Sequence, residues 1–110
     1  MLGLLGPLWA GQPTSSKRGV GTNEMSYRKN FEVLNTGLSW IYNWTYQAPS
    51  VIRNDWEQTG LEFVPMVWGG GIDQERNKQA VKDYLKAHPS IKYILGFNEP
   101  NFTSQSRLTP

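Results

Sequence analysis

The sequence predicts an α/β fold in which parallel strands alternate with helices. From residue 17 onward, short apolar runs alternate with longer amphipathic stretches. Those stretches repeat apolar residues three and four positions apart, which is the period of a helix with one buried face. Unusual polar and aromatic residues also gather at the end of each apolar run. These observations give the order β-α-β-α-β-α-β, with right-handed crossovers between the strands.

Four short strands are expected, and the second is the clearest because it is rich in aromatic and β-branched residues. Pro65 argues against a central position for the third strand, because proline cannot donate to the sheet ladder. We expect a bulge or the end of the strand there. The expected strands are residues 17–21, 38–44, 61–68 and 91–97.

The first expected helix lies between the first two strands. Its apolar residues Tyr27, Phe31 and Leu34 are spaced four and three apart, so they share one face. Gly37 follows the helix and suits the left-handed conformation that often ends one.

Two further helices are expected. The second begins near Ser50, a candidate N-cap, and ends at Gly60. The third begins at Asp73 and ends at His88-Pro89. Its inner stripe consists of Ala80, Val81, Tyr84 and Leu85.

Composition excludes several classes of function. Lys and Arg number 11 against 9 Asp and Glu, a net charge of +2, and the positive residues are scattered. A nucleic-acid-binding protein would instead gather them in a stripe. The chain has no cysteine for disulfides or thiolate metal sites. His88 has no second histidine for a metal pair, and we expect it at a helix end near carbonyl groups.

The first sixteen residues differ from the rest of the chain. Residues 1–10 are apolar but broken by Gly and Pro, and they are far fewer than the ~20 residues that span a membrane. They also lack the basic start of a signal peptide. We therefore expect residues 1–16 to be a leader or linker remnant, residues 17–110 to be the folded domain, and no membrane partner.

Two architectures fit the predicted order: an open doubly wound sheet or part of a (β/α)₈ barrel. The unusual residues favour the barrel, because barrel active sites lie at the carboxyl ends of the strands. They include Asn43 and Trp44 at the end of the second strand, Trp68 at the end of the third, and Asn98 with Glu99 directly after the fourth. A full barrel needs ~250 residues. We therefore expect the N-terminal half of a barrel, with about four strands and three helices.

Asn98-Glu99-Pro100 is the sharpest local motif. A Glu directly after a parallel strand is held rigidly at the barrel mouth, and Pro100 is expected to restrict Glu99 to extended geometry. Glycoside hydrolysis needs one such carboxyl to give a proton to the leaving oxygen, and a second one to stabilise the positive sugar carbon. Alone, the tripeptide is equally compatible with a Glu that follows a strand by chance.

Four stretches in chain order resemble glycoside hydrolase family 128, the glycosyl hydrolase catalytic core family of endo-β-1,3-glucanases. The resemblance implies a retaining barrel enzyme without a cofactor, whose acid/base is the Glu of an Asn-Glu pair after strand four. The matching stretches are residues 17–20, 38–44, 62–69 and 94–101, followed by Gln105 and residues 108–110.

Carried over to this sequence, the resemblance implies that Glu99 is the acid/base and that Asn98 contacts a sugar hydroxyl. It further suggests which residues line a cleft for β-1,3-glucan. These are Asn43, Trp44, Trp68 and Gln105.

The family's nucleophile is a Glu after strand seven, and no such strand is expected in this chain. Glu24 and Asp73 follow the first and third strands, but neither matches that nucleophile. Stabilisation of a helix N-terminus is the simpler interpretation of both. The chain alone is therefore not expected to be a competent glucanase.

Three interpretations remain open. The first is a fragment of a retaining β-1,3-glucan hydrolase, expected to be secreted or associated with a cell wall. The second is a non-catalytic module that binds β-glucan through its aromatic residues. The third is a truncated product without a function of its own. Half a barrel leaves two unpaired strand edges, so self-association is also expected.

Overall fold

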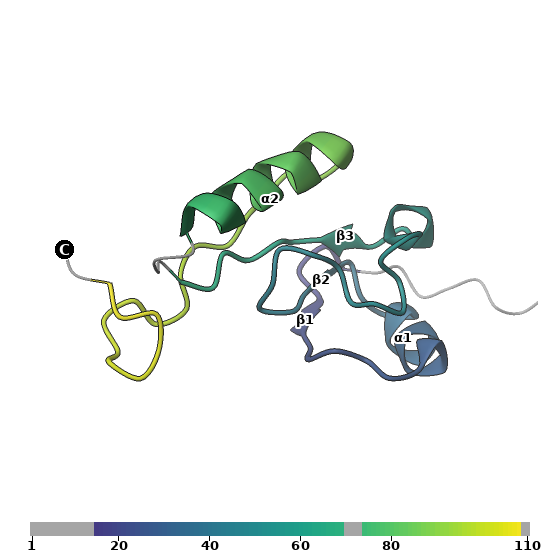
Figure 1. Cartoon of the computed structure of the whole chain (residues 1–110). Coiled ribbons are helices and arrows are strands. Elements are labelled where there is room, and N and C mark those ends of the chain that lie inside the picture. Colours follow the sequence, from purple (N-terminus) through teal and green to yellow (C-terminus); the bar gives the residue numbers. More distant parts are fainter. Residues whose placement is uncertain (1–14, 70–73, 109–110) are drawn as a thin grey trace, which may run out of the picture.

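A computed structural model describes residues 15–69 and 74–108 of the chain (Figure 1). It contains three strands, two α-helices and one 3₁₀ helix. In chain order these are β1 (Gly19–Gly21), α1 (Arg28–Asn35), β2 (Trp40–Tyr42), η1 (Trp56–Thr59), β3 (Glu62–Phe63) and α2 (Gln74–Ala87). The leader expected at residues 1–16 falls almost wholly outside the described residues, and so does Asp73.

The three strands form one parallel sheet in the order β1-β2-β3, which confirms the parallel arrangement that the alternation predicts. Gly19 is the partner of Trp40, and Trp40 is also the partner of Glu62. The close approach of aromatic rings explains the glycine in β1. A Cβ atom at Gly19 would lie 1.8 Å from the Trp40 ring.

The fourth expected strand, residues 91–97, is not a regular strand. It runs parallel to the chain after β3, where the Leu95 amide donates to Pro65 O (2.8 Å) and the Val67 amide donates to Leu95 O (3.1 Å). These bonds make one isolated bridge between Met66 and Leu95. Because Pro65 cannot donate, the ladder is interrupted. The expectation of about four strands is therefore wrong, since the described residues form three.

The second expected helix is also wrong in form. Only the 3₁₀ helix η1 forms, and residues 50–55 make turns. The Ser50 amide donates to Glu24 Oε1 (2.5 Å), so Ser50 does not cap a helix. Gly60 ends η1 in the left-handed conformation, with φ of 78°. Gly37 lacks that conformation, because Thr36 ends α1 with helical geometry.

The core lies between α1, the sheet and η1. Phe31 from α1, Ile41 from β2 and Phe63 from β3 are completely or almost completely buried. Of the apolar face predicted for α1, only Phe31 is buried, whereas Tyr27 is 70% exposed and Leu34 is 40% exposed. The remaining core residues are Met25, Ala48, Ile52, Trp56 and Leu61.

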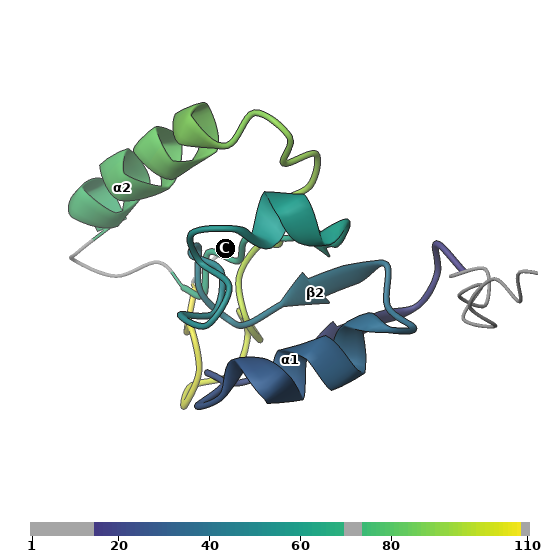
Figure 2. The ribbon, with the colours of Figure 1, turned by 90° about the vertical axis from the view of Figure 1, so that its right-hand side faces the viewer.

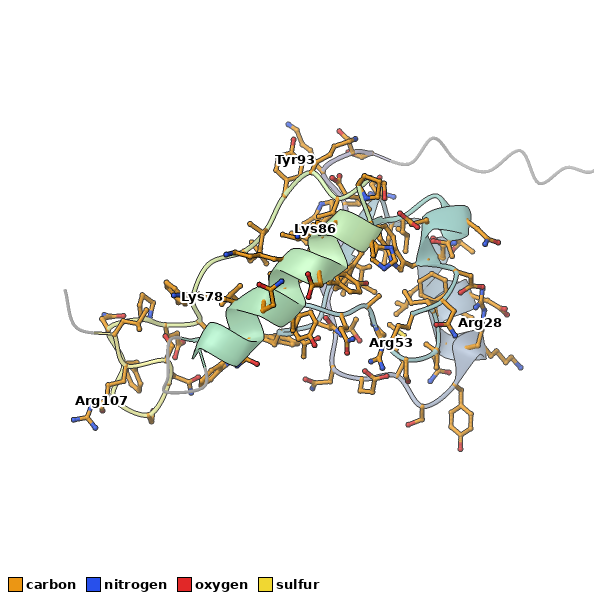
Figure 3. All side chains as sticks on the ribbon, turned by 45° about the horizontal axis from the view of Figure 1, so that its top comes forward. Arg28, Arg53, Lys78, Lys86, Tyr93 and Arg107 are labelled. Carbon is orange, nitrogen blue, oxygen red and sulfur yellow. The ribbon has the colours of Figure 1, made fainter. Side chains whose placement is uncertain are left out.

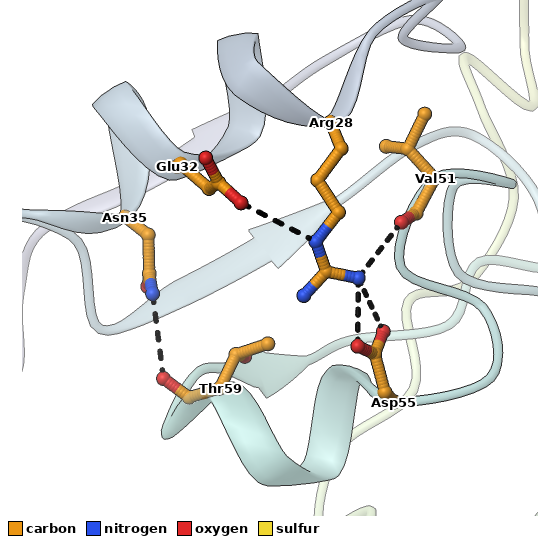
Figure 4. Close-up of polar contacts among 6 residues, drawn as sticks. All are labelled: Arg28, Glu32, Asn35, Val51, Asp55 and Thr59. Carbon is orange, nitrogen blue, oxygen red and sulfur yellow. Dashed lines mark hydrogen bonds and ion pairs between the residues drawn. The ribbon is translucent and has the colours of Figure 1, made fainter.

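α1 is also tied to the turn before η1 by polar contacts (Figure 4). The Arg28 guanidinium lies 2.7 Å from the Asp55 carboxylate and donates to Val51 O at 3.1 Å. Asn35 donates to Thr59 O at 3.4 Å near the other end of α1. These contacts fix α1 against the segment that leads into η1.

α2 crosses one side of the molecule (Figure 2). Contacts of Tyr84 anchor it there. The Tyr84 ring makes edge contacts with Tyr46 and Phe63 at centroid distances of 5.8 and 6.4 Å, and its hydroxyl accepts the Ala48 amide at 3.3 Å. His88 lies at the end of α2, as predicted. Its ring packs at a tilt against Tyr84, with a centroid distance of 4.4 Å, and its Nδ1 lies 3.3 Å from the Glu57 carboxylate.

The cationic side chains stay scattered in the folded chain. Arg28, Lys86 and Arg107 lie in separate regions of the molecule (Figure 3). Within the described ranges, no helix is long and apolar enough to span a membrane.

Burial of the Tyr84 hydroxyl makes the free energy of unfolding depend on pH in the alkaline range. Burial raises the pKa of the Tyr84 hydroxyl above its ordinary value of 10.0. As pH rises past about 10, the unfolded chain therefore releases this proton first, and the free energy of unfolding falls. We expect urea titrations between pH 9 and 11 to show this loss, and Tyr84→Phe to reduce it. The exposed Tyr93 supplies the control, since Tyr93→Phe should keep the wild-type slope.

Candidate active site

The end of β2 places two of the predicted cleft residues. Asn43 is only 5% exposed. Its amide donates to Gln47 O at 3.0 Å and its Oδ1 accepts the Thr45 hydroxyl at 3.3 Å. These bonds hold a tight turn, in which Trp44 takes a left-handed φ of 49°. Asn43 therefore shapes the turn that presents Trp44.

Trp44 and Trp68 line the same cleft, although they follow different strands. The cleft has a volume of about 440 Å³. Trp68 remains 42% exposed there, and the Trp44 ring lies 5.1 Å from the Tyr42 ring. Besides these two indoles, the cleft is lined by Thr45, Tyr46, Met66, Val67, Gly69, Asn77, Val81 and Ser106.

Asn98 and Gln105 are brought together beside this cleft. The Asn98 side-chain amide donates to Gln105 Oε1 at 2.8 Å. The Asn98 backbone amide donates to Trp68 O at 2.8 Å, which joins the pair to the segment that follows β3. The loop of residues 98–108 that carries them lies at the end of the molecule far from α1 (Figure 1).

Glu99 is exposed and does not line the cleft. Its φ of 42° is left-handed, so the extended geometry expected from Pro100 is wrong. The chain turns back directly after Glu99, where its carbonyl accepts the Phe102 amide at 3.0 Å. A non-glycine residue in this conformation before a proline is strained, and such strain often gathers at functional sites.

Residues 19–110 match the family model described as "Glycosyl hydrolase catalytic core". The chain belongs to this family. No curated protein matches the chain. The resemblance to glycoside hydrolase family 128 is thus confirmed by a match over most of the chain, and by solved structures of family members.

Three endo-β-1,3-glucanases of family 128 are similar in structure. The subgroup II enzyme from Pseudomonas viridiflava has 37% identity and a TM-score of 0.71, over 88% of this chain and 36% of its own. The subgroup II enzyme from Sorangium cellulosum has 32% identity and a TM-score of 0.63, over 78% of this chain and 34% of its own. The subgroup I enzyme from Amycolatopsis mediterranei, in complex with laminaritriose, has 26% identity and a TM-score of 0.55, over 86% of this chain and 35% of its own.

The chain thus spans about a third of the length of these family members. Its three parallel strands and two α-helices match part of their structures, so it forms a partial domain of the glycosyl hydrolase catalytic core family.

A second carboxylate singled out in the sequence, Glu24, is also absent from the described lining of the cleft. The Glu24 carboxylate accepts hydrogen bonds from Ser50, which lower the pKa of Glu24, so it serves a turn in the fold. Asp73 lies outside the described residues. Among the described residues that line the cleft, none is a carboxylate. Residues 15–69 and 74–108 also contain no cluster that could hold a metal ion.

Sequence reasoning missed Ser106. It is 7% exposed, lines the cleft, and donates through Oγ to Asn98 O at 2.5 Å. In the sequence it is the last of four uncharged polar residues, Thr103 to Ser106, and nothing there separates it from Ser104. Only the return of the loop onto Asn98 sets it apart.

Proposed function

We propose that this chain is the proton-donating part of a retaining endo-β-1,3-glucanase with a (β/α)₈ barrel. Glu99 is the acid/base: it protonates the departing glycosidic oxygen and later takes a proton from the attacking water. The nucleophilic carboxylate, which retaining chemistry requires ~5–5.5 Å from the acid/base, is supplied by the remainder of the barrel. No cofactor takes part.

One observation carries this proposal. Residues from three separate segments of the chain come together: Trp44 and Trp68 line one cleft, and the Asn98–Gln105 pair is bonded to Trp68 O beside it. Indole faces and paired amides suit the apolar faces and hydroxyl groups of a sugar. In barrel enzymes this end of the strands is where substrate binds. The A. mediterranei relative is in complex with laminaritriose, which makes that oligosaccharide the appropriate probe.

Binding of laminaritriose to the 110-residue chain tests the cleft directly. We expect saturable binding in isothermal titration calorimetry and a Kd about tenfold weaker for Trp68→Ala, which corresponds to the loss of ~1.4 kcal/mol of ring contact. Tyr93 is 65% exposed outside the cleft, so Tyr93→Ala should bind like the wild type. Absence of binding by the folded wild-type chain, or equal affinity in both variants, would contradict the proposed cleft.

A second function is a non-catalytic β-glucan-binding module. The observation that favours it is the cleft itself, which has two indoles but no carboxylate among its described lining residues. This function predicts laminaritriose binding without the release of reducing sugar, even after the chain is joined to the rest of a family 128 barrel.

We further propose that the chain associates through the outer edge of residues 91–97. Apolar side chains remain exposed along this edge, including Tyr93 at 65%, Ile94 at 46% and Phe97 at 46%. Figure 3 shows Tyr93 at the periphery of the molecule. An open edge with exposed apolar side chains is a template for pairing with another strand, from a second copy or from the remainder of a barrel.

A further inference from the structure

The Asn98 residue is held on three sides. Its amide donates to Trp68 O at 2.8 Å, and its side chain donates to Gln105 Oε1 at 2.8 Å. Its carbonyl accepts two bonds from one residue, the Ser106 amide at 3.3 Å and Ser106 Oγ at 2.5 Å. Both of these hydrogen bonds to the carbonyl oxygen of Asn98 therefore depend on Ser106.

This carbonyl belongs to the peptide plane between Asn98 and Glu99. The φ angle of Glu99 is the rotation that directly follows this plane, and at 42° it is left-handed. The direction of the Glu99 side chain is therefore set by the plane and by that strained rotation. The bonds from Ser106 fix this plane, and they also close residues 99–105 into a loop. Inside the loop, the Phe102 amide donates to Glu99 O at 3.0 Å.

Space for Ser106 comes from Gly69. A Cβ atom at Gly69 would lie 3.0 Å from Ser106 Cβ and 3.4 Å from Ser106 Cα. Ser106 is 7% exposed and cannot move outward freely. Gly69 follows Trp68, whose carbonyl accepts the Asn98 amide. Residues 68–69 therefore contact both ends of the loop, Asn98 through Trp68 and Ser106 through Gly69.

We propose that Ser106 is a positioning residue for Glu99, with Gly69 providing the room that its hydroxyl bond needs. This inference rests on the proposed function, since it assigns Ser106 a role only through the acid/base. Ser106 fixes the Asn98–Glu99 peptide and thereby the direction from which Glu99 delivers its proton. It does not itself contact the reacting atoms.

The test uses the full chain joined to the remaining C-terminal part of the P. viridiflava glucanase, so that the barrel is complete. The activity of Ser106→Ala is compared on laminari-oligosaccharides and on a 2,4-dinitrophenyl β-laminarioligosaccharide. The second substrate has a leaving group that needs no proton donor. We expect kcat/KM to fall about tenfold to a hundredfold on laminari-oligosaccharides, because displacement of a catalytic group by ~1 Å can lower the rate 10²-fold. On the dinitrophenyl substrate, kcat/KM should fall less than about twofold, because its cleavage needs no proton from Glu99.

Two further variants separate positioning from a general loss of structure. Ser104→Ala removes an exposed hydroxyl from the same loop and should keep wild-type values on both substrates. Gly69→Ala should reproduce the selective loss in weaker form, because its Cβ displaces Ser106 while the Ser106 hydroxyl remains.

Each outcome bears on the inference. Equal losses on both substrates would assign Ser106 to stability, and a rise in KM with unchanged kcat would assign it to substrate binding; either result overturns a positioning role. A Ser106→Ala enzyme equal to the wild type would also overturn it. Failure of the proposed function looks different, since the folded wild-type fusion would then lack activity on laminari-oligosaccharides.

Discussion

Glu99→Gln in the completed barrel should lower kcat/KM on laminari-oligosaccharides by about 10²- to 10⁴-fold, the usual contribution of a general acid. Glutamine keeps the size of the side chain but cannot give a proton to the departing oxygen. The kcat/KM on the substrate with a dinitrophenyl leaving group should fall much less, because kcat/KM reports cleavage of the glycosidic bond and this bond breaks without protonation. Initial rates on both substrates, with the chain fused to the C-terminal part of the P. viridiflava enzyme, measure the effect.

Glu24 supplies the matched control. It is also a carboxylate near a strand end, but its oxygens accept bonds from Ser50 and its pKa is lowered, so it stays ionised and has no proton to donate at neutral pH. Glu24→Gln should therefore leave the ratio between the two substrates unchanged. If Glu24→Gln caused the selective loss and Glu99→Gln did not, the assignment of the acid/base would be wrong.

Phe63→Ala should destabilise the chain by about 3–5 kcal/mol, the usual cost of removing a buried phenylalanine. Phe63 is fully buried in β3, and its ring contacts Trp56 at 5.8 Å and Tyr84 at 6.4 Å. Its removal opens a cavity where the sheet, η1 and α2 meet. Since small domains have a free energy of unfolding of only about 5–15 kcal/mol, much of the total would be lost. Urea unfolding followed by circular dichroism measures the change.

Phe102 gives the comparison for this stability effect. It is 57% exposed in the loop after Glu99, so Phe102→Ala should change the free energy of unfolding by no more than about 0.5 kcal/mol. Similar unfolding midpoints for Phe63→Ala and the wild type would show that the core is placed wrongly.

The sequence was sufficient for the features that depend on local pattern. The alternation of apolar and amphipathic runs predicts the parallel sheet and α2, and the stripe with Val81 and Tyr84 does face the body of the protein. Trp44 and Trp68 could be assigned to one cleft because the carboxyl ends of parallel strands share one edge. The family resemblance, carried by the same strand ends, is also confirmed.

The remaining features depend on contacts that no local pattern encodes. Glu99 is left-handed because the chain after it returns to Asn98, and this closure outweighs the usual effect of Pro100. Ser106 matters only because of that same closure. Ser50 resembles an N-cap, but its amide instead bonds to Glu24, a residue 26 positions away. Residues 91–97 have strand composition, yet Pro65 limits their pairing to one bridge.

The release of reducing sugar from laminarin by the wild-type chain, alone and joined to the C-terminal part of the P. viridiflava glucanase, tests the central claim most directly. We expect hydrolysis by the fusion and none by the chain alone, because in the proposed mechanism Glu99 needs a nucleophilic carboxylate from the rest of the barrel. Hydrolysis by the chain alone would contradict this division of roles. A folded fusion that binds laminaritriose without hydrolysing laminarin would identify the chain as a binding module instead.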